Sequence, residues 1–538
     1  MDFDKILEKC GDYGRYQFML LALFGYINFF ASQHYFGQTM ISFVPDHWCF
    51  HPKLANRTFD EIKRIYSKLD KPSCTRLEDI IDDIGIPSAE FCTKWIYDYD
   101  FGYKSMNTEL NWVCDSAYIS IYGQSFFFVG SVIGTLLYGF LSDKFGRLVL
   151  LIIANLSAVT GDIATTFSTD IITFSISRFV SGLAVDTNAY LMYMLVLEYI
   201  RPSKRIVTLN FVIGIFYTAG LVITPWIAVA IGHWKFYLLS ITSPLCLVFT
   251  FIYIVNESAQ WLVTQNNIDG AILRLKRIAK FNGVSVSEDD FLDFRRYCEI
   301  YSKNAEGNEN PANFTDLFKK PRLRKRIFIL FYVLMVTTLC YNIVSRNVEG
   351  TGLSPFMLFS VSSTTVFPAA AVLIFLQNKI GRKGMATSSA IFCAVIAGIT
   401  GVVLRTEQGQ EKNVALLASL QILARFGIAL AYESGNQFAM ELMPTSVRGQ
   451  AIAGLHVAGY AISFLSVPIL HLSTYFASLP SIVLTSLFLS EAFVILFLPE
   501  TLNKVLPKTI EDGENFSIQE KVFDFACFKR EKVKDMIS

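Results

Sequence analysis

The chain of 538 residues is 52% hydrophobic and only 17% charged, and its mean hydropathy is +0.41. Soluble proteins carry about a quarter charged residues, so this composition excludes an ordinary soluble enzyme and favours an integral membrane protein. The 47 basic and 46 acidic residues nearly cancel, which removes any global electrostatic argument for a nucleic-acid partner.

Apolar runs of about twenty residues follow one another along the chain, each long enough to cross roughly 30 Å of hydrocarbon as a helix. The twelve predicted helices begin near Gln17, Ala117, Leu148, Ile171, Ile206, Phe236, Arg326, Pro355, Met385, Val414, Gln450 and Ile482. A hydrophilic linker, residues 257–325, separates the first six helices from the last six. We therefore expect an all-α integral membrane protein with an N-terminal half, residues 17–256, and a C-terminal half, residues 326–500.

Basic residues predict the orientation in the membrane. Clusters at 144–147, 201–205, 319–326 and 379–383 fall on even-numbered loops, which the positive-inside rule assigns to the cytoplasm. The N-terminal segment 1–16 and the tail 501–538 are then both cytoplasmic. Segment 1–16 lacks the pattern of a cleavable signal peptide, so the first span is expected to be retained.

The loop of residues 45–116 lies on the opposite, extracellular side. It contains four of the ten cysteines, and an even number of cysteines in an exported loop predicts two disulfides with three possible pairings. The four are Cys49, Cys74, Cys92 and Cys114. Asn56-Arg57-Thr58 in the same loop is a glycosylation acceptor triplet on the correct side of the membrane.

Two motifs recur in register in the two halves. Residues 139–147, Gly-Phe-Leu-Ser-Asp-Lys-Phe-Gly-Arg, are echoed by residues 376–383 between spans eight and nine. A glutamate and an arginine also stand seven residues apart at the ends of spans four and ten. Carboxylates and arginines at such turns can clamp neighbouring helices by ion pairing. The predicted clamp residues are Asp143, Arg147, Glu198, Arg205, Glu441 and Arg448.

These repeats resemble the loop motif and internal symmetry of the major facilitator superfamily. A narrower resemblance, to the organic cation, anion and carnitine transporter family, rests on six segments. They are residues 43–49 (FVPDHWC), 92–98 (CTKWIYD), 111–115 (NWVCD), 256–262 (NESAQWL), 316–326 (DLFKKPRLRKR) and 498–503 (LPETLN). The resemblance implies a twelve-helix major facilitator fold in the plasma membrane and a small organic ion as substrate. Residues 256–262 depart from the usual P-E-S-P-R-W-L, which indicates a divergent member.

Ionisable residues inside the spans are the candidates for substrate binding, because unpaired charges in hydrocarbon are costly. Residues 178–186 (RFVSGLAVD) in span four and 425–433 (RFGIALAYE) in span ten each place an acid eight residues after an arginine. The family resemblance implies that these spans line the central cavity. Asp186 and Glu433 are then expected to face each other across it as counter-charges for a cation.

Two alternatives remain open for these charges. Asp186 and Glu433 can instead pair structurally with Arg178, Arg425 or His456, or stay protonated. Both arginines are equally compatible with substrate binding and with a structural ion pair.

Aromatic residues near Asp186 fit a cation. Tyr190 and Tyr193 share its helical face at i+4 and i+7, and Tyr217 lies in span five. Aromatic faces attract quaternary ammonium groups by about 0.5 to 2 kcal/mol, although ordinary packing explains any single ring as well. Alignment with the family places Tyr460 where cation transporters carry an aspartate and anion transporters an arginine, so the usual charge selector is missing.

The leading hypothesis is a polyspecific transporter of small organic cations or zwitterions that works by alternating access and is driven by the membrane potential. The alternatives are organic anion transport through the two arginines, ion-coupled uptake of a carnitine-like zwitterion, and a non-transporting receptor or scaffold. The chain has no phosphate-binding glycine loop, no H-E-x-x-H motif and no serine elbow, so we expect no enzyme activity, metal or cofactor.

The topology predicts that Asn56 is glycosylated outside the cell. Asn56→Gln should increase electrophoretic mobility, because N-glycans are added only to segments translocated into the secretory lumen. Asn515→Gln removes a triplet expected in the cytoplasm and should leave the mobility unchanged. The topology is contradicted if Asn56→Gln has no effect, or if antibody reaches the tail beyond Thr501 in intact cells.

Overall fold

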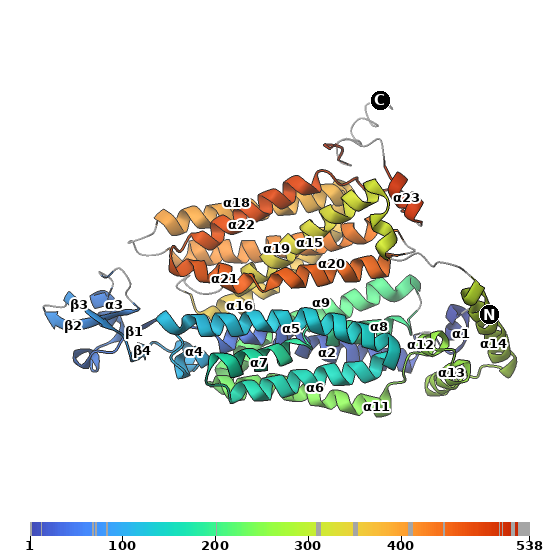
Figure 1. Ribbon diagram of the computed structural model, residues 1–538, viewed down its shortest axis with the longest axis horizontal. Helices are drawn as coiled ribbons and strands as arrows, with labels where there is room; N and C mark the ends of the chain where they lie inside the picture. Colours follow the sequence, from blue (N-terminus) through green and yellow to red (C-terminus); the bar gives the residue numbers. More distant parts are fainter. Residues whose placement is uncertain are drawn as a thin grey trace.

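We describe a computed structural model of the chain, whose helices form two bundles side by side (Figure 1). The described residues are 3–11, 13–66, 69, 73–81, 84–200, 202–307, 314–347, 353–406, 413–444, 447–504, 506–507, 509–517 and 522–525.

The N-terminal bundle contains the six predicted spans of the first half. Its helices are α2 (Arg15–Ile41), α5 (Ala117–Phe145), α6 (Arg147–Thr166), α7 (Ile171–Gly182) with α8 (Thr187–Leu197), α9 (Pro202–Ile231), and α10 (Trp234–Thr242) with α11 (Phe251–Ile254). Within this bundle α5 packs against α7, and α2 packs against α9. The fourth span is therefore two helices, α7 and α8, joined by a turn.

The C-terminal bundle repeats the arrangement. Its helices are α15 (Pro321–Arg346), α16 (Pro355–Thr364) with α17 (Val366–Ile380), α18 (Arg382–Thr406), α19 (Val414–Leu442), α20 (Arg448–Ser463) with α21 (Ser466–His471), and α22 (Leu479–Ile495). Here α18 packs against α22, and α15 packs against α20.

Helices occupy the positions of the twelve predicted spans. Among the described residues, ten helical segments are long and apolar enough to cross a membrane. The other two positions are filled by α2, whose 27 residues include buried polar side chains, and by α22, an apolar helix of 17 residues. Several helices, such as α15 and α18, begin a few residues before the apolar run that predicted them, because their first turns carry basic residues.

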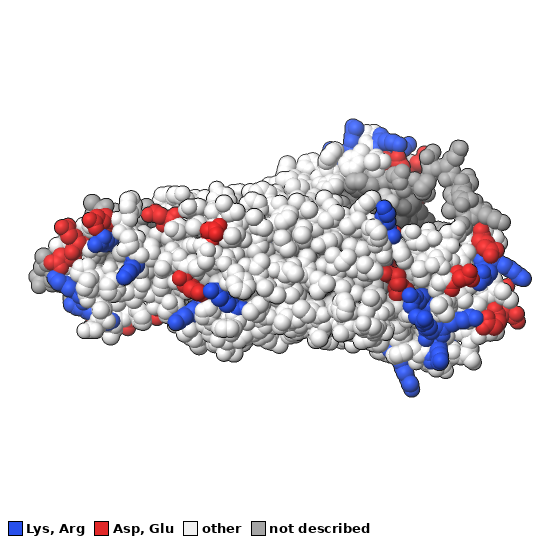
Figure 2. All heavy atoms as spheres, turned by 60° about the horizontal axis from the view of Figure 1, so that its bottom comes forward, with Lys and Arg blue, Asp and Glu red and all other residues white. Residues whose placement is uncertain are grey.

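Charge is concentrated at the two ends of the molecule. In the space-filling view, lysine, arginine, aspartate and glutamate side chains gather at both ends, and a broad uncharged belt separates them (Figure 2). This belt is the surface expected to face hydrocarbon. We call the end with the disulfide-bonded loop the outer end, and the opposite end the inner end.

The loop after α2 forms a small outer domain. Strand β1 (His47–Cys49) pairs antiparallel with β4 (Trp95–Tyr97), and β2 (Thr75–Ile81) pairs antiparallel with β3 (Ile84–Phe91). Helix α3 (Phe59–Tyr66) packs its apolar face on these strands. The sequence did not predict these two-stranded sheets, since strands of three to eight residues give weak patterns beside membrane-spanning runs.

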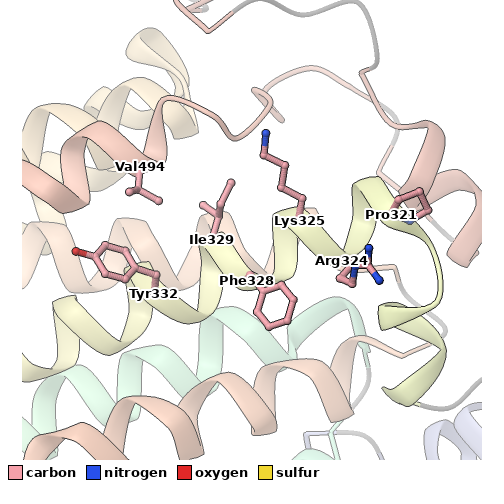
Figure 3. Close-up of a pocket in the computed structure, with 7 residues that line it drawn as sticks. All are labelled: Pro321, Arg324, Lys325, Phe328, Ile329, Tyr332 and Val494. Carbon is pink, nitrogen blue, oxygen red and sulfur yellow. The ribbon is translucent and has the colours of Figure 1, made fainter.

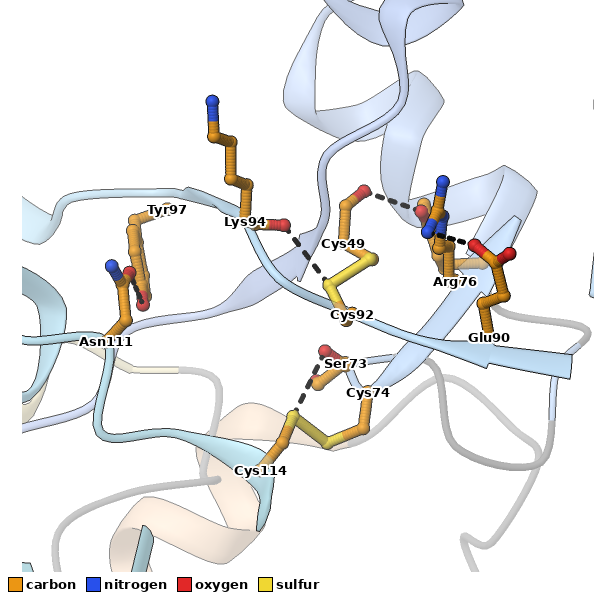
Figure 4. The surroundings of a disulfide bond; sticks show 11 residues. Cys49, Ser73, Cys74, Arg76, Glu90, Cys92, Lys94, Tyr97, Asn111 and Cys114 are labelled. Atoms are coloured by element: carbon orange, nitrogen blue, oxygen red, sulfur yellow. Dashed lines mark hydrogen bonds and ion pairs between the residues drawn. A yellow bond between two sulfur atoms is a disulfide. The ribbon is translucent and has the colours of Figure 1, made fainter. Parts of the chain in front are cut away.

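Two disulfides hold the outer domain together, as the cysteine count predicted (Figure 4). Cys49 is bonded to Cys92, and Cys74 is bonded to Cys114. The first disulfide joins β1 to the end of β3, and the second joins the start of β2 to the residues before α5. The sequence left three pairings open, and this is the one that the fold adopts.

Short helices cover the inner end of the N-terminal bundle. They are α1 (Phe3–Lys9), α12 (Ala259–Thr264), α13 (Ile268–Asn282) and α14 (Glu288–Gly307). The Asn282 side chain donates to the carbonyls of Cys10 and Gly11, and it accepts from the Tyr16 amide at 2.8 Å. The hydrophilic linker thus lies against the start of α2 as a helical layer.

The outer domain should depend on its disulfides. Cys74→Ser opens a loop that spans 40 residues and leaves Cys114 unpaired, which should cost about 4 kcal/mol of stability and impair delivery to the cell surface. Cys246→Ser removes an exposed free thiol and is the matched control. Differential alkylation of surface protein measures the pairing, and free reactivity of all four loop cysteines would overturn it.

Candidate functional site

The two bundles contact each other through polar groups close to the outer end. The Tyr35 hydroxyl of α2 donates to the Asn342 amide oxygen of α15 at 2.6 Å, and the Arg346 guanidinium donates to the Thr39 hydroxyl at 3.0 Å. The Ser360 hydroxyl of α16 donates to a carbonyl of α9 at 2.8 Å.

Aromatic packing closes the same region. Phe36 packs edge-on against Phe359, with ring centroids 5.7 Å apart, and Phe43 packs against Phe356 at 5.4 Å. Phe36 lies near the end of α2, Phe43 follows that helix, and Phe356 and Phe359 lie on α16, so the bundles meet tightly near the outer end.

Asp186 lies where the fourth span is broken. Helix α7 ends at Gly182, residues 183–186 form a turn, and Asp186 precedes the first residue of α8. The turn is close to α5: a Cβ on Gly134 would lie 1.9 Å from the Leu183 carbonyl oxygen, so only glycine fits there. This approach brings Asp186 beside Ser131 of α5.

Hydroxyl groups surround the Asp186 carboxylate. Ser131 donates to it at 2.6 Å, and the phenol of Tyr460 on α20 of the other bundle also hydrogen-bonds to it. Among the described residues, no lysine or arginine forms an ion pair with Asp186. Asp186 therefore links the two bundles through hydroxyl groups alone among its hydrogen-bond partners.

Glu433 lies in the middle of α19. Protein atoms surround its side chain, yet solvent still reaches it. That combination is expected of a residue that lines a water-filled cavity. Within the part of the chain that is described, Glu433 makes no hydrogen bond or ion pair, so its charge is also available.

The two acids do not contact each other directly. Tyr432 lies near both of them. That Asp186 and Glu433 face each other across a central cavity stays a prediction.

Tyrosines gather around Asp186. Tyr217 and Tyr460, which the sequence pointed to, lie within electrostatic range of Asp186 and of each other. Tyr341 and Tyr432 join them, with their rings 5.0 Å apart. Sequence reasoning missed these two, although Tyr432 directly precedes Glu433 in the repeated motif.

Tyr190 and Tyr193 do not belong to this cluster. Tyr190 lies within electrostatic range of Asp143 and Arg147 near the inner end, and the ring of Tyr193 lies 6.1 Å from that of Phe24. Both tyrosines share the helical face of Asp186. They lie one and two turns further along α8, however, and therefore nearer the inner end.

Arg178 takes part in a buried structural network. Its guanidinium donates to Asp162 of α6 at 2.9 Å, and both side chains are essentially inaccessible. Ser181 and Thr242 donate to the same carboxylate, and His34 lies 3.2 Å from it. The arginine is thus paired structurally, as one alternative held, but its partner is Asp162 and not Asp186. Sequence reasoning missed Asp162 because it is not part of a repeated motif, although an acid inside a span was itself a signal.

Arg425 and Arg346 are buried arginines without a carboxylate partner among the described residues. Arg425 donates to the Tyr341 hydroxyl at 3.2 Å, and its guanidinium lies 4.6 Å from that ring. Arg346 lies 5.1 to 5.3 Å from the rings of Tyr35, Phe36 and Phe128. Sequence reasoning missed Arg346, which ends α15 at the edge of its apolar run.

The inner clamp is present in the N-terminal bundle. Arg147 follows Gly146, whose φ of 101° makes the tight turn, and it pairs with Asp143 at 3.1 Å and with Glu198 at 3.5 Å. Glu257, which the sequence did not include in the clamp, accepts from the Arg147 amide at 3.1 Å. The Arg205 side chain lies outside the described residues.

The clamp of the C-terminal bundle uses a different arginine from the predicted one. Glu441 pairs with Arg382 at 3.0 Å, whereas Arg448 donates to the Met443 carbonyl. Arg382 follows Gly381 as Arg147 follows Gly146, so the turn glycine decides which arginine reaches the glutamate. Glu500 accepts from the Arg382 amide at 2.8 Å, in the place of Glu257.

Comparison with known proteins identifies this architecture. Residues 88–511 match the model of a family described as sugar (and other) transporter. An organic cation transporter-like protein of Drosophila melanogaster is 27% identical and aligns over 97% of this chain and 94% of its own length. A steroid transmembrane transporter of Homo sapiens, SLC22A24, is 27% identical over 96% of each chain. The predicted resemblance to organic ion transporters is thus confirmed along nearly the whole chain.

The fold is that of a solved transporter. The inward-open structure of the xylose transporter XylE from E. coli superposes with a TM-score of 0.56, covering 92% of this chain and 99% of that one at 15% identity. This likeness confirms the predicted major facilitator fold.

The buried network predicts a large loss of stability for Asp162→Asn. The substitution leaves the Arg178 charge uncompensated and should cost about 3 to 5 kcal/mol, seen as a lower Tm of the purified protein. Adding Arg178→Gln should recover part of the loss. Asp289→Asn, an exposed acid at the start of α14, is the control, and an equal Tm shift there would contradict the role of the pair.

Proposed function

We propose that this chain, which belongs to the sugar (and other) transporter family of the major facilitator superfamily, moves small organic cations across the plasma membrane. The observation that carries the proposal is the pair of uncompensated carboxylates, Asp186 and Glu433, inside the bundle. Charges at this depth are retained where they face a ligand or a cavity.

Three features support a cationic substrate. Asp186 accepts from the Ser131 hydroxyl and forms no ion pair with a described lysine or arginine, so a cationic ligand can supply its counter-charge. Glu433 is accessible to solvent and makes no ion pair with any described residue. Tyrosine rings near these acids offer π faces that attract organic ammonium groups by about 0.5 to 2 kcal/mol each.

Alternating access is the proposed mechanism. The bundles are joined near the outer end by the contacts of α2 with α15 and α16, so this arrangement suits a site open toward the inner end. Asp186 also bonds Tyr460 of the opposite bundle. A cation that binds Asp186 competes for this bond and thereby couples occupancy to the relative position of the bundles.

The membrane potential is a sufficient driving force. A monovalent cation that crosses a potential of about 60 mV gains roughly 1.4 kcal/mol, which supports about tenfold accumulation. Facilitated diffusion therefore requires no coupling ion.

A zwitterion is the second candidate substrate. Arg425 and Arg346 lack a carboxylate partner among the described residues, and Arg425 contacts Tyr341, which belongs to the tyrosine cluster. A ligand with a carboxylate toward these arginines and an ammonium group toward Asp186 would neutralise both signs of charge. The names of the relatives, which include a steroid transporter, are compatible with more than one charge class.

Neutralising Asp186 or Glu433 should weaken the binding of a cationic substrate. Glu433→Gln should weaken the apparent affinity for a labelled organic cation about thirtyfold, because losing a buried charge partner commonly costs about 2 kcal/mol or more. Asp186→Asn should act in the same direction, and the double variant should be non-additive if both acids hold one ligand. Uptake under clamped voltage, normalised to surface expression, measures the effect.

Glu288→Gln is the matched control, because it removes an exposed glutamate that pairs with Lys276 outside the membrane. Undiminished cation uptake in the Asp186→Asn, Glu433→Gln double variant would overturn the proposal. The same uptake measurement with labelled anions and zwitterions tests the second candidate. It shows whether Arg425→Gln selectively impairs a substrate that bears a carboxylate.

A further inference from the structure

A pocket of about 410 Å³ lies on the outside of the C-terminal bundle near its inner end, away from the candidate substrate site (Figure 3). It is lined by Pro321, Arg324, Lys325, Phe328, Ile329 and Tyr332 of α15 and by Val494 of α22. The spacing of three and four residues places the α15 side chains on one face of that helix.

The pocket carries two uncompensated cations. Arg324 and Lys325 are exposed, and neither forms an ion pair with a described carboxylate. Lys325 lies 5.7 Å from the ring of Phe497, two residues after the end of α22. By contrast, the nearby Lys319 pairs with Asp316, and Arg326 donates to the Gly513 carbonyl.

The other lining residues are aromatic or aliphatic. Phe328, Ile329 and Tyr332 follow the cations along α15, and Val494 of α22 lies beside them (Figure 3). From Pro321 to Tyr332 the helix rises about 16 Å, which is half the thickness of the hydrocarbon layer. The lining of the pocket therefore changes from basic residues at the inner end to apolar residues toward the middle of the membrane. The acyl chains of a lipid extend in the same direction from its headgroup.

The face of α15 that lines the pocket lies on the outside of the bundle, where it is open to the membrane. Another face of the first turn of α15 is covered by α23 (Ile510–Asn515), where Glu514 accepts from the Arg322 and Leu323 amides. The Tyr332 hydroxyl shares a hydrogen bond of 2.6 Å with Ser490, which fixes the apolar wall between α15 and α22.

We propose that this pocket binds an anionic phospholipid of the inner leaflet. The phosphate and acidic headgroup lie against Arg324 and Lys325, and the start of an acyl chain lies along Phe328, Ile329 and Tyr332. Charge complementarity selects an anionic headgroup. The apolar wall favours a lipid over a free phosphate, because a soluble anion leaves that surface uncovered.

Native mass spectrometry of the purified full-length protein tests the site with phosphatidylserine and with phosphatidylcholine of identical acyl chains. We expect selective retention of phosphatidylserine and a loss of about thirtyfold in its apparent affinity in the Arg324→Gln, Lys325→Gln double variant, since each charge contributes about fivefold. The charge-preserving Arg324→Lys, Lys325→Arg variant should retain binding, which separates loss of the site from misfolding.

Arg277→Gln with Lys280→Gln is the matched control. It removes two exposed cations of the same inner end, on α13 and outside the pocket. Equal loss of phosphatidylserine in both double variants would overturn the proposal in favour of a diffuse surface charge. The proposal is also overturned if the protein retains phosphatidylcholine as strongly as phosphatidylserine, or if inorganic phosphate displaces the bound lipid.

Discussion

Arg178 and Asp162 form a buried ion pair, and the charge balance of the cavity depends on it. Both residues are removed from water, so each charge needs a partner inside the protein. If Arg178 pointed to Asp186, eight residues along the same span, the cavity would contain a neutral pair. Because Asp162 of α6 takes the arginine instead, Asp186 has no arginine partner among the described residues. The same pair joins α6 to α7, so it both fixes the packing of these helices and leaves Asp186 without a counter-ion.

A tightened turn in the fourth span positions the Asp186 carboxylate. Between α7 and α8 the Ala184 amide donates to the Ser181 carbonyl and the Val185 amide to the Gly182 carbonyl, so the turn keeps its backbone hydrogen bonds inside the membrane. Here α5 covers the turn: a Cβ on Gly130 would lie 2.2 Å from the Phe179 carbonyl oxygen, so α5 approaches the end of α7 backbone to backbone. Asp186 at this turn lies against Ser131 of α5 and near the opposite bundle. The close approach at Gly130 and Gly134 thereby determines where the Asp186 carboxylate lies.

Much of the architecture could be predicted from the sequence because it follows from local patterns. Apolar runs of fixed length predicted the spans, and the glycine-arginine turn at Gly146-Arg147 predicted the clamp of the N-terminal bundle. Partner choice was less predictable, because it depends on which side chains the tertiary fold brings together. Glu441 pairs with Arg382, 59 residues away, and not with Arg448. Arg346 and Asp162 escaped notice for a related reason: neither belongs to a repeat, and only the packing of distant helices gives them a role.

The two bundles are most alike at the inner end and least alike around the candidate site. Arg147 and Arg382 each follow a turn glycine, and Glu257 and Glu500 each accept from the amide at the start of the next helix. In the cavity the symmetry fails, since Asp186 accepts from two hydroxyls whereas Glu433 has no hydrogen-bond partner among the described residues. The clamp is thus built alike in both bundles, because a turn glycine, an arginine and an accepting glutamate recur in register. The two acids have different surroundings, so under the proposed function a ligand would meet a hydrogen-bonded, preorganised carboxylate on one bundle and a solvent-accessible one on the other.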